Sequence, residues 1–219
     1  MAAIEARDLY RFFHAADEET LALRGVSMTV DPGELVAVTG PSGSGKSTLL
    51  ACLAGLDEPD GGMVLINGQV MTRRTEPERA ALRAAGIGML FQTANLIEHL
   101  TVAQNVTLAQ QMSGRPDSAR RKEVLAELGL ADRAQANPSR LSGGEAARAG
   151  LAVALANDPP VILADEPTGE VDKAIEHRIL TLLHARAAAG AAVVVVTHSD
   201  AVAASADRTI ALEDGRIAS

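Results

Sequence analysis

Short apolar runs recur along the chain and predict buried strands. Each spans four or five residues, which is too short for a helix, and polar residues, glycine or proline bound it. Strands of a parallel sheet that is covered on both faces have this composition. The runs occupy residues 35–39, 87–91, 161–164, 192–196 and 209–212.

Longer segments between these runs have the pattern and the boundaries of helices. Because strands and helices alternate, we expect βαβ units and an α/β fold with a mainly parallel sheet. No strand signal occurs between residues 93 and 140, which favours a helical subdomain there. The predicted helices span residues 47–56, 76–85, 102–112, 117–128, 144–156 and 174–188.

The beginning of the chain predicts an antiparallel β subdomain. Residues 4–9 mark one strand and 26–30 alternate as another, with a polar loop expected at 15–20. Asn67-Gly68 between two short apolar segments is a strong hairpin signal. We therefore expect one domain over residues 1–219, in which 1–92 and 157–219 form the core with its β subdomain and 93–156 form the helical subdomain.

A glycine-rich stretch supplies the main candidate site. Residues 40–48, GPSGSGKST, fit the phosphate-loop pattern GxxxxGK[ST] and lie between a predicted strand and a predicted helix. Glycines let the backbone turn its N–H groups toward an anion at the helix N-terminus. Lys46 is expected to reach the β- and γ-phosphates, and Ser47 to ligate Mg²⁺. The expected nucleotide-binding residues are Gly40, Pro41, Ser42, Gly43, Ser44, Gly45, Lys46, Ser47 and Thr48.

Two adjacent carboxylates follow the apolar run at 161–164. We expect Asp165 to hold Mg²⁺, through water, at the end of its strand. Strand alternation would turn Glu166 away from Asp165 and toward an attacking water, where a carboxylate acts as a general base or orients the water. The alternative is a pair of solvated acids at a strand end.

Charge, cysteine content and the length of the apolar runs limit the partners and the compartment that we expect for the protein. Acidic residues number 28 against 20 basic ones, a net charge of −8, which argues against a nucleic-acid partner. A single cysteine, Cys52, cannot form an internal disulfide, which favours a reducing cytosol. No apolar run approaches the roughly 20 residues of a membrane span. We therefore expect a soluble protein, or one that a partner holds at a membrane.

Residues 141–145, LSGGE, distinguish between kinds of phosphate-loop protein. They open the helix predicted at 144–156 and place small residues at a second helix terminus. The stretch resembles the signature of ATP-binding-cassette (ABC) ATPases. The resemblance implies a homodimer in which the signature of one subunit closes over the γ-phosphate held by the other. The implied signature contacts are Ser142, Gly143, Gly144 and Glu145. An ordinary N-capped helix is the alternative.

Four further positions match this family in order. The resemblance implies that Gln92 senses Mg²⁺ and the transport partner, and that His198 lies near the γ-phosphate. It also implies that Asp172 couples two active sites and that Phe13 stacks on adenine, with Tyr10 as the alternative. The implied catalytic residues are Glu166, His198, Gln92 and Lys46, and the implied metal ligands are Ser47, Gln92 and Asp165.

The resemblance extends from about residue 4 to residue 217 and favours the lipoprotein-releasing, macrolide-export and cell-division subgroup. GPSGSGKSTLL, FQxxNLIEHLTVAQNV and LADEPTGEVD carry it. Several residues depart from those usual in this subgroup. Glu145 stands where Gln is commoner, and Ala146, Ala147 and Val153 stand where Gln, Gln and Arg are usual. Glu170 and Val171 stand where Asn and Leu are usual. Acids that face a polyphosphate weaken its binding, but the core site residues remain, so we expect activity.

The resemblance implies an ATP- and Mg²⁺-dependent ATPase subunit that powers a membrane permease on a separate chain, at the inner face of the cell membrane. Residues 93–113 are the expected permease contact, because Leu96, Ile97, Leu100 and Val102 form an apolar cluster. The alternative is that these residues belong to the subdomain core. Two other functions stay open: a regulatory or structural cassette with little hydrolysis, and a soluble ABC ATPase that does not serve transport.

Overall fold

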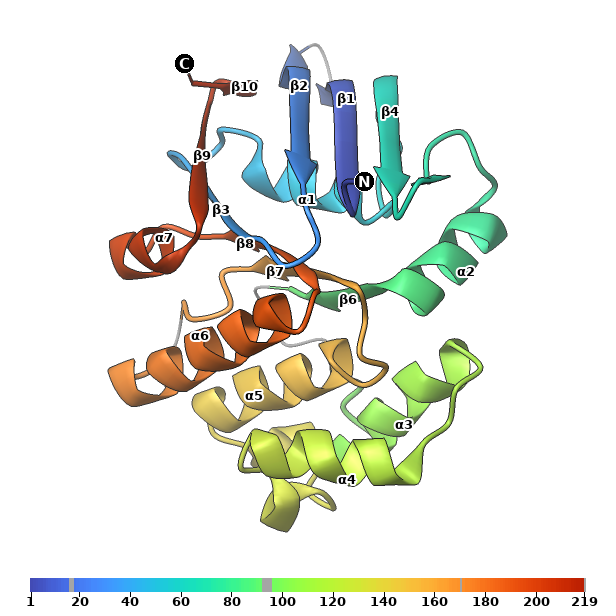
Figure 1. Ribbon diagram of the computed structural model, residues 1–219, viewed down its shortest axis with the longest axis vertical. Coiled ribbons are helices and arrows are strands. Elements are labelled where there is room, and N and C mark those ends of the chain that lie inside the picture. Colours follow the sequence, from blue (N-terminus) through green and yellow to red (C-terminus); the bar gives the residue numbers. More distant parts are fainter. Residues whose placement is uncertain (16–17, 92–95, 170, 219) are drawn as a thin grey trace.

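An antiparallel sheet covers one side of the molecule (Figure 1). The computed structural model describes residues 1–15, 18–91, 96–169 and 171–218. The strands of this sheet follow the order β2-β1-β4-β5, and each neighbouring pair is antiparallel. The expected β subdomain is therefore confirmed. Its strands are β1 (Ile4–Ala15), β2 (Glu18–Val30), β4 (Gly61–Ile66) and β5 (Gln69–Val70).

A second sheet forms the centre of the molecule in the order β10-β9-β3-β8-β7-β6. The neighbours from β9 to β6 are parallel, and β10 is antiparallel to β9. The expected α/β core is confirmed. Strand β8 is buried along its whole length because layers cover both faces of the sheet. The strands are β3 (Leu35–Thr39), β6 (Ile87–Leu90), β7 (Val161–Asp165), β8 (Ala192–Val196), β9 (Arg208–Glu213) and β10 (Arg216–Ile217).

Helices cover both faces of the parallel sheet (Figure 1). Helix α1 packs between the two sheets, whereas α3 to α6 lie on the opposite face with a second apolar core. Their bounds are α1 (Lys46–Leu53), α2 (Glu76–Gly86), α3 (Val102–Met112), α4 (Ser118–Glu127), α5 (Gly143–Ala154), α6 (Lys173–Ala188) and α7 (Asp200–Ser205), with 3₁₀ turns at Ala131–Arg133 and Pro138–Arg140. Within the described ranges, no helix has both the length and the apolar character that crossing a membrane requires.

Two sequence expectations about the elements were wrong. The loop expected at 15–20 is strand on both sides, since Phe13 pairs with Thr20 and Ala15 with Glu18. Ladder hydrogen bonds come from the backbone, so the pairing continues where the side-chain pattern has become polar. Helix α7 was missed because six residues are too few to show a helical period. The boundaries of the helical subdomain at 93 and 156 stay a prediction.

Leu53 on α1 is completely buried in the core between the sheets, and Leu56 just beyond the helix is 43% exposed. We expect Leu53→Ala to lower the free energy of unfolding by about 2–5 kcal/mol, because it removes apolar contacts and leaves a cavity. The matched change Leu56→Ala should cost less than about 0.5 kcal/mol. Urea unfolding of both variants measures the difference, and equal losses would contradict this placement of α1.

Candidate functional site

The N-terminus of α1 is a helix end whose N-cap residue has no side chain. Gly45 occupies that position in a left-handed conformation, with φ of 99°. In contrast, α3, α4, α5 and α6 each begin with a side chain that accepts a hydrogen bond from the first turn. The first N–H groups of a helix have no intrahelical partner, and the helix dipole adds positive character. This end of α1 can therefore bind an anion with its backbone.

Close packing explains two of the glycines in the loop before α1. A Cβ on Gly40 would lie 2.0 Å from the carbonyl oxygen of Leu212, and one on Gly45 would lie 2.3 Å from that of Ala22. On Gly43 a Cβ would meet no atom within 4 Å. The loop is thus pressed against β9 and β2 at two points and open between them. That open concavity fits a phosphate group.

Lys46 crosses this loop with its side chain. Its Nζ donates hydrogen bonds to the carbonyl oxygens of Gly40 and Pro41, each at 2.9 Å, and the residue is 6% exposed. Burial lowers the pKa of Lys46, while the charges of Glu166 and Asp165 act in the opposite direction. The ammonium group therefore lies within electrostatic reach of both carboxylates, at the mouth of the loop.

Glu166 lies beyond the end of its strand. Asp165 is the last residue of β7, and Glu166 follows with φ of 47°, held by a 2.9 Å hydrogen bond from its N–H to the oxygen of Val196. Strand alternation consequently does not set the direction of its side chain, and the expectation that Glu166 turns away from Asp165 toward an attacking water stays a prediction. Both carboxylates line one cleft. A non-glycine residue at positive φ is uncommon and requires support from its surroundings.

The Glu166 carboxylate has neighbours that orient it. Thr197 Oγ1 donates to Glu166 Oε2 at 3.4 Å, and His198 Nε2 lies 3.6 Å from Glu166 Oε1. The Glu166 side chain is 13% exposed and that of His198 is 56% exposed, so the imidazole faces the open side. Sequence reasoning missed Thr197. Its position between a buried strand and His198 is the signal that could have suggested it.

These groups share one cleft of about 360 Å³. It brings together residues from β1 and β2, the loop before α1, the first turn of α1, and the ends of β7 and β8. Its lining is Phe13, Ala22, Ser42, Gly43, Gly45, Lys46, Ser47, Thr48, Asp165, Glu166, Val196 and His198. Ser44 is buried beneath the loop at 3% exposure. Separate parts of the sequence thus meet where the backbone can hold an anion.

Phe13, rather than Tyr10, provides the aromatic side of the cleft. Phe13 is 40% exposed and lines the cleft together with the glycine loop and the two carboxylates. The Tyr10 ring packs against Gly25 and Gly61 instead. The geometry therefore favours Phe13 as the surface on which a flat ring could stack.

The start of α5 is a capping box. Ser142 Oγ accepts from the N–H of Glu145 at 3.2 Å, and Glu145 Oε2 accepts from the N–H of Ser142 at 2.8 Å. Arg133 Nε adds a 2.8 Å ion pair to Glu145. The Ser142 N–H and the Arg133 guanidinium lower the pKa of Glu145 to about 2. This is the N-capped helix of the alternative interpretation, although a hydroxyl that accepts one hydrogen bond can still donate another.

Asp172 and the residues that begin α5 are not among the residues that line the cleft. Asp172 caps α6 by accepting from the N–H groups of Ala174 and Ile175, both at 2.9 Å. Gln92 and Glu170 lie outside the described residues. Gly143 is open, because a Cβ there would meet nothing within 4 Å. The roles that the resemblance implies for the α5 terminus and Asp172, in a site shared with a second subunit, stay predictions.

Comparison with known proteins decides the family. The family model described as ABC transporter matches residues 23–169. The chain belongs to the ABC transporter family. Macrolide export ATP-binding/permease protein MacB from Hyphomonas neptunium is 42% identical over 219 residues, which is 99% of this chain and 34% of that protein. The cassette therefore spans about a third of the length of the macrolide-export relatives that it matches.

Two other relatives match the cassette over most of their own length. The uncharacterized ABC transporter ATP-binding protein Rv0986 from Mycobacterium tuberculosis is 38% identical, covering 98% of this chain and 88% of that protein. The dimeric structure of MJ0796, a bacterial ABC transporter cassette, has a TM-score of 0.93 at 36% identity, covering 99% of this chain and 97% of that one. A second MJ0796 structure, bound to ADP and Pi in a post-hydrolysis state, has the same TM-score. The resemblance stated from the sequence is confirmed.

The low pKa of Glu145 predicts a pH-dependent contribution to stability. Because the folded state favours the carboxylate, the unfolded chain binds more protons below pH 4.5. The contribution is complete above that pH and is lost as the pH falls toward 2. We expect the stability difference between wild type and Glu145→Gln to shrink on acidification, measured by urea unfolding from pH 6 to pH 3. Arg133→Gln should weaken the same pH dependence, and a constant difference would contradict the prediction.

Proposed function

We propose that the cassette is the ATP-hydrolysing, nucleotide-binding subunit of an ABC transporter and powers a membrane permease on a separate chain. One observation carries this proposal: the uncapped α1 terminus, Lys46, Asp165 and Glu166 line one cleft in a chain of this family. The match over most of Rv0986, which is named an ATP-binding protein, supports a cassette whose permease is another polypeptide. We place the complex at the inner face of the cell membrane.

ATP would bind with its phosphates in the glycine loop. The N–H groups of the loop and of the first turn of α1 would donate to phosphate oxygens, and Lys46 would leave the carbonyl oxygens of Gly40 and Pro41 to meet the β- and γ-phosphates. These donors occupy fixed positions before the reaction begins. They therefore stabilise the charge that develops on the transferred phosphoryl group without reorganisation.

Glu166 is the group that we assign to the attacking water. Its Oε2 accepts from Thr197, its Oε1 lies beside His198 without a hydrogen-bond partner among the described residues, and the residue lines the cleft. It would orient the water and take up its proton as the water oxygen bonds to the γ-phosphorus, while the bond from the γ-phosphorus to the β–γ bridging oxygen breaks and ADP leaves. His198 would donate a hydrogen bond to the phosphoryl oxygens, since its imidazole faces the open side.

Ser47 and Asp165 fit a Mg²⁺ ion. Both line the cleft and both supply oxygen donors, which Mg²⁺ prefers, and a nucleotide site typically uses one or two protein oxygens together with the phosphates. When bound, the ion would offset the negative charge of the phosphates and of the transferred phosphoryl group. Gln92, the third expected ligand, lies outside the described residues.

The proposal includes a head-to-tail homodimer. Ser142, Gly143, Gly144 and Glu145 of one subunit would close over the γ-phosphate of the other, and Asp172 would couple the two sites. The open surface at Gly143 supports this arrangement, and the structure of MJ0796, the similar cassette, is dimeric. The helical subdomain at 93–156 would carry the signature toward the partner. Opening and closing of this dimer would move the permease.

Glu166→Gln tests the function directly. The amide keeps the size of the side chain but cannot accept a proton, so we expect the turnover number for ATP to fall by at least about 100-fold. ATP binding should survive and the dimer should accumulate. Phosphate release and size-exclusion chromatography with MgATP measure the two effects, with Glu176→Gln on α6 as the control. Unchanged hydrolysis in Glu166→Gln would remove Glu166 from this role.

Lys46→Ala should abolish nucleotide binding rather than turnover alone. Ligand at 100 times its dissociation constant stabilises a folded protein by about 2.7 kcal/mol, which raises the melting temperature of a domain of this size by about 5–11 °C. We expect that thermal shift with MgATP in wild type and in Lys122→Ala, which removes an exposed lysine on α4, but not in Lys46→Ala. Binding without phosphate release in wild type, even beside its permease, would favour the regulatory cassette instead.

A further inference from the structure

We infer that Arg11 is a positioning residue for the nucleotide base: it fixes the Phe13 ring from behind and ties that ring to the turn that follows α1. The inference rests on the proposed function, because it concerns the base of the same nucleotide. It adds a residue for which the sequence analysis assigned no role.

Phe13 needs support to act as a stacking surface. It lies on β1 near the end of the β1–β2 ladder, where it pairs with Thr20, and its side chain is 40% exposed. An exposed aromatic side chain pays conformational entropy when it is held in one rotamer for a ligand. A contact that already holds the ring before binding reduces that cost.

Arg11 makes that contact. Its guanidinium carbon lies 4.7 Å from the centroid of the Phe13 ring, within the range of a cation–π interaction. Because Phe13 lines the nucleotide cleft and Arg11 is not among its lining residues, we infer that the cation covers the face of the ring turned away from the cleft. The cleft-facing side stays available for a base, and stacking on an aromatic ring is a general way to bind one.

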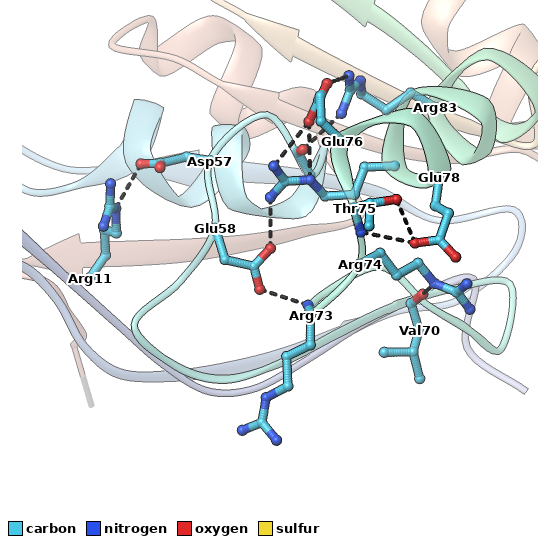
Figure 2. Close-up of polar contacts among 12 residues, drawn as sticks. Arg11, Asp57, Glu58, Val70, Arg73, Arg74, Thr75, Glu76, Glu78 and Arg83 are labelled. Carbon is cyan, nitrogen blue, oxygen red and sulfur yellow. Dashed lines mark hydrogen bonds and ion pairs between the residues drawn. The ribbon is translucent and has the colours of Figure 1, made fainter.

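Two carboxylates hold the Arg11 guanidinium in place. Its Nε donates to Asp57 Oδ2 at 2.8 Å and its Nη1 to Asp60 Oδ2 at 3.1 Å, with the side chain 22% exposed (Figure 2 shows the Asp57 contact). Asp60 Oδ2 also accepts from the N–H of Phe12 at 2.7 Å. That N–H, followed by the Arg11 guanidinium, lowers the pKa of Asp60. The carboxylate is therefore charged at neutral pH.

The turn that carries Asp57 and Asp60 is itself anchored. It follows α1 directly, and Glu58 within it accepts from the N–H of Arg73 at 2.7 Å and from Arg79 of α2 at 2.6 Å (Figure 2). The N-terminus of α1 faces the phosphates, whereas the turn after its C-terminus holds Arg11. Helix α1 thus sets the spacing between the phosphate loop and the base platform.

Binding of MgADP and of inorganic pyrophosphate, measured by calorimetry, separates the base from the phosphates without turnover. We expect Arg11→Met to raise the dissociation constant for ADP about threefold and to leave that for pyrophosphate unchanged. Phe13→Ala should raise it about tenfold. Arg7→Met on the same strand, whose guanidinium pairs with Glu5, removes an equal charge and should change neither constant.

A double-mutant cycle tests whether Arg11 acts through Phe13. If it does, adding Arg11→Met to Phe13→Ala should cause no further loss of ADP affinity. Arg11→Lys keeps the charge but not the two-pronged link to Asp57 and Asp60, so its effect should be smaller than that of Arg11→Met. Asp57→Asn gives a second route to the same result where Arg11→Met folds poorly, and it too should weaken ADP binding selectively.

The outcomes distinguish this inference from the proposed function. The role of Arg11 would be overturned by any of three results. These are additive losses of ADP affinity in the double-mutant cycle, an equal loss of pyrophosphate affinity, and unchanged ADP binding by Arg11→Met and Asp57→Asn. Each of these results leaves the nucleotide site standing if wild type binds both ligands. Failure of wild type to bind either ligand would overturn the proposed function itself.

Discussion

The structure depends on one helix end whose backbone N–H groups have no side chain to satisfy them. Most helices of this cassette begin with a side-chain cap, and α1 begins with Gly45 instead. Unsatisfied donors at a helix terminus are costly unless water or a ligand pairs with them. The cassette keeps them at the mouth of a cleft, so that a polyphosphate is the partner that completes the helix.

Buried strands hold this terminus and its chemistry in register. β3 leads into the loop, β7 ends in Asp165, and β8 ends beside His198, and these strands are parallel neighbours. Their carboxyl ends therefore meet at one edge of the sheet, as ligand sites in open α/β sheets do. The antiparallel sheet adds the aromatic side of the cleft through Phe13. One cleft thus combines a cationic end, formed by Lys46 and the α1 terminus, with the carboxylates of Asp165 and Glu166.

The glycine-rich N-termini of α1 and α5 differ in what satisfies their backbone N–H groups. At α1 the terminus is open to a ligand, whereas at α5 Ser142 and Glu145 satisfy each other and Arg133 balances the added charge. The acid that replaces the commoner glutamine is therefore paired within its own subunit. In the proposed dimer this pairing would reduce the repulsion that an unpaired carboxylate exerts on the phosphates of the other subunit.

Local patterns in the sequence determined the elements, the phosphate loop and the family. A βαβ alternation, GPSGSGKST and LSGGE each depend on short-range backbone and side-chain requirements that neighbouring residues express. Only the tertiary structure decided how distant residues meet. Strand alternation does not apply at Glu166, because this residue lies past the end of β7 at positive φ and its N–H donates to Val196 of β8, some thirty residues later. Likewise, Thr197 and Arg11 gain their roles from partners on other elements, and spacing along the chain carries no record of such contacts.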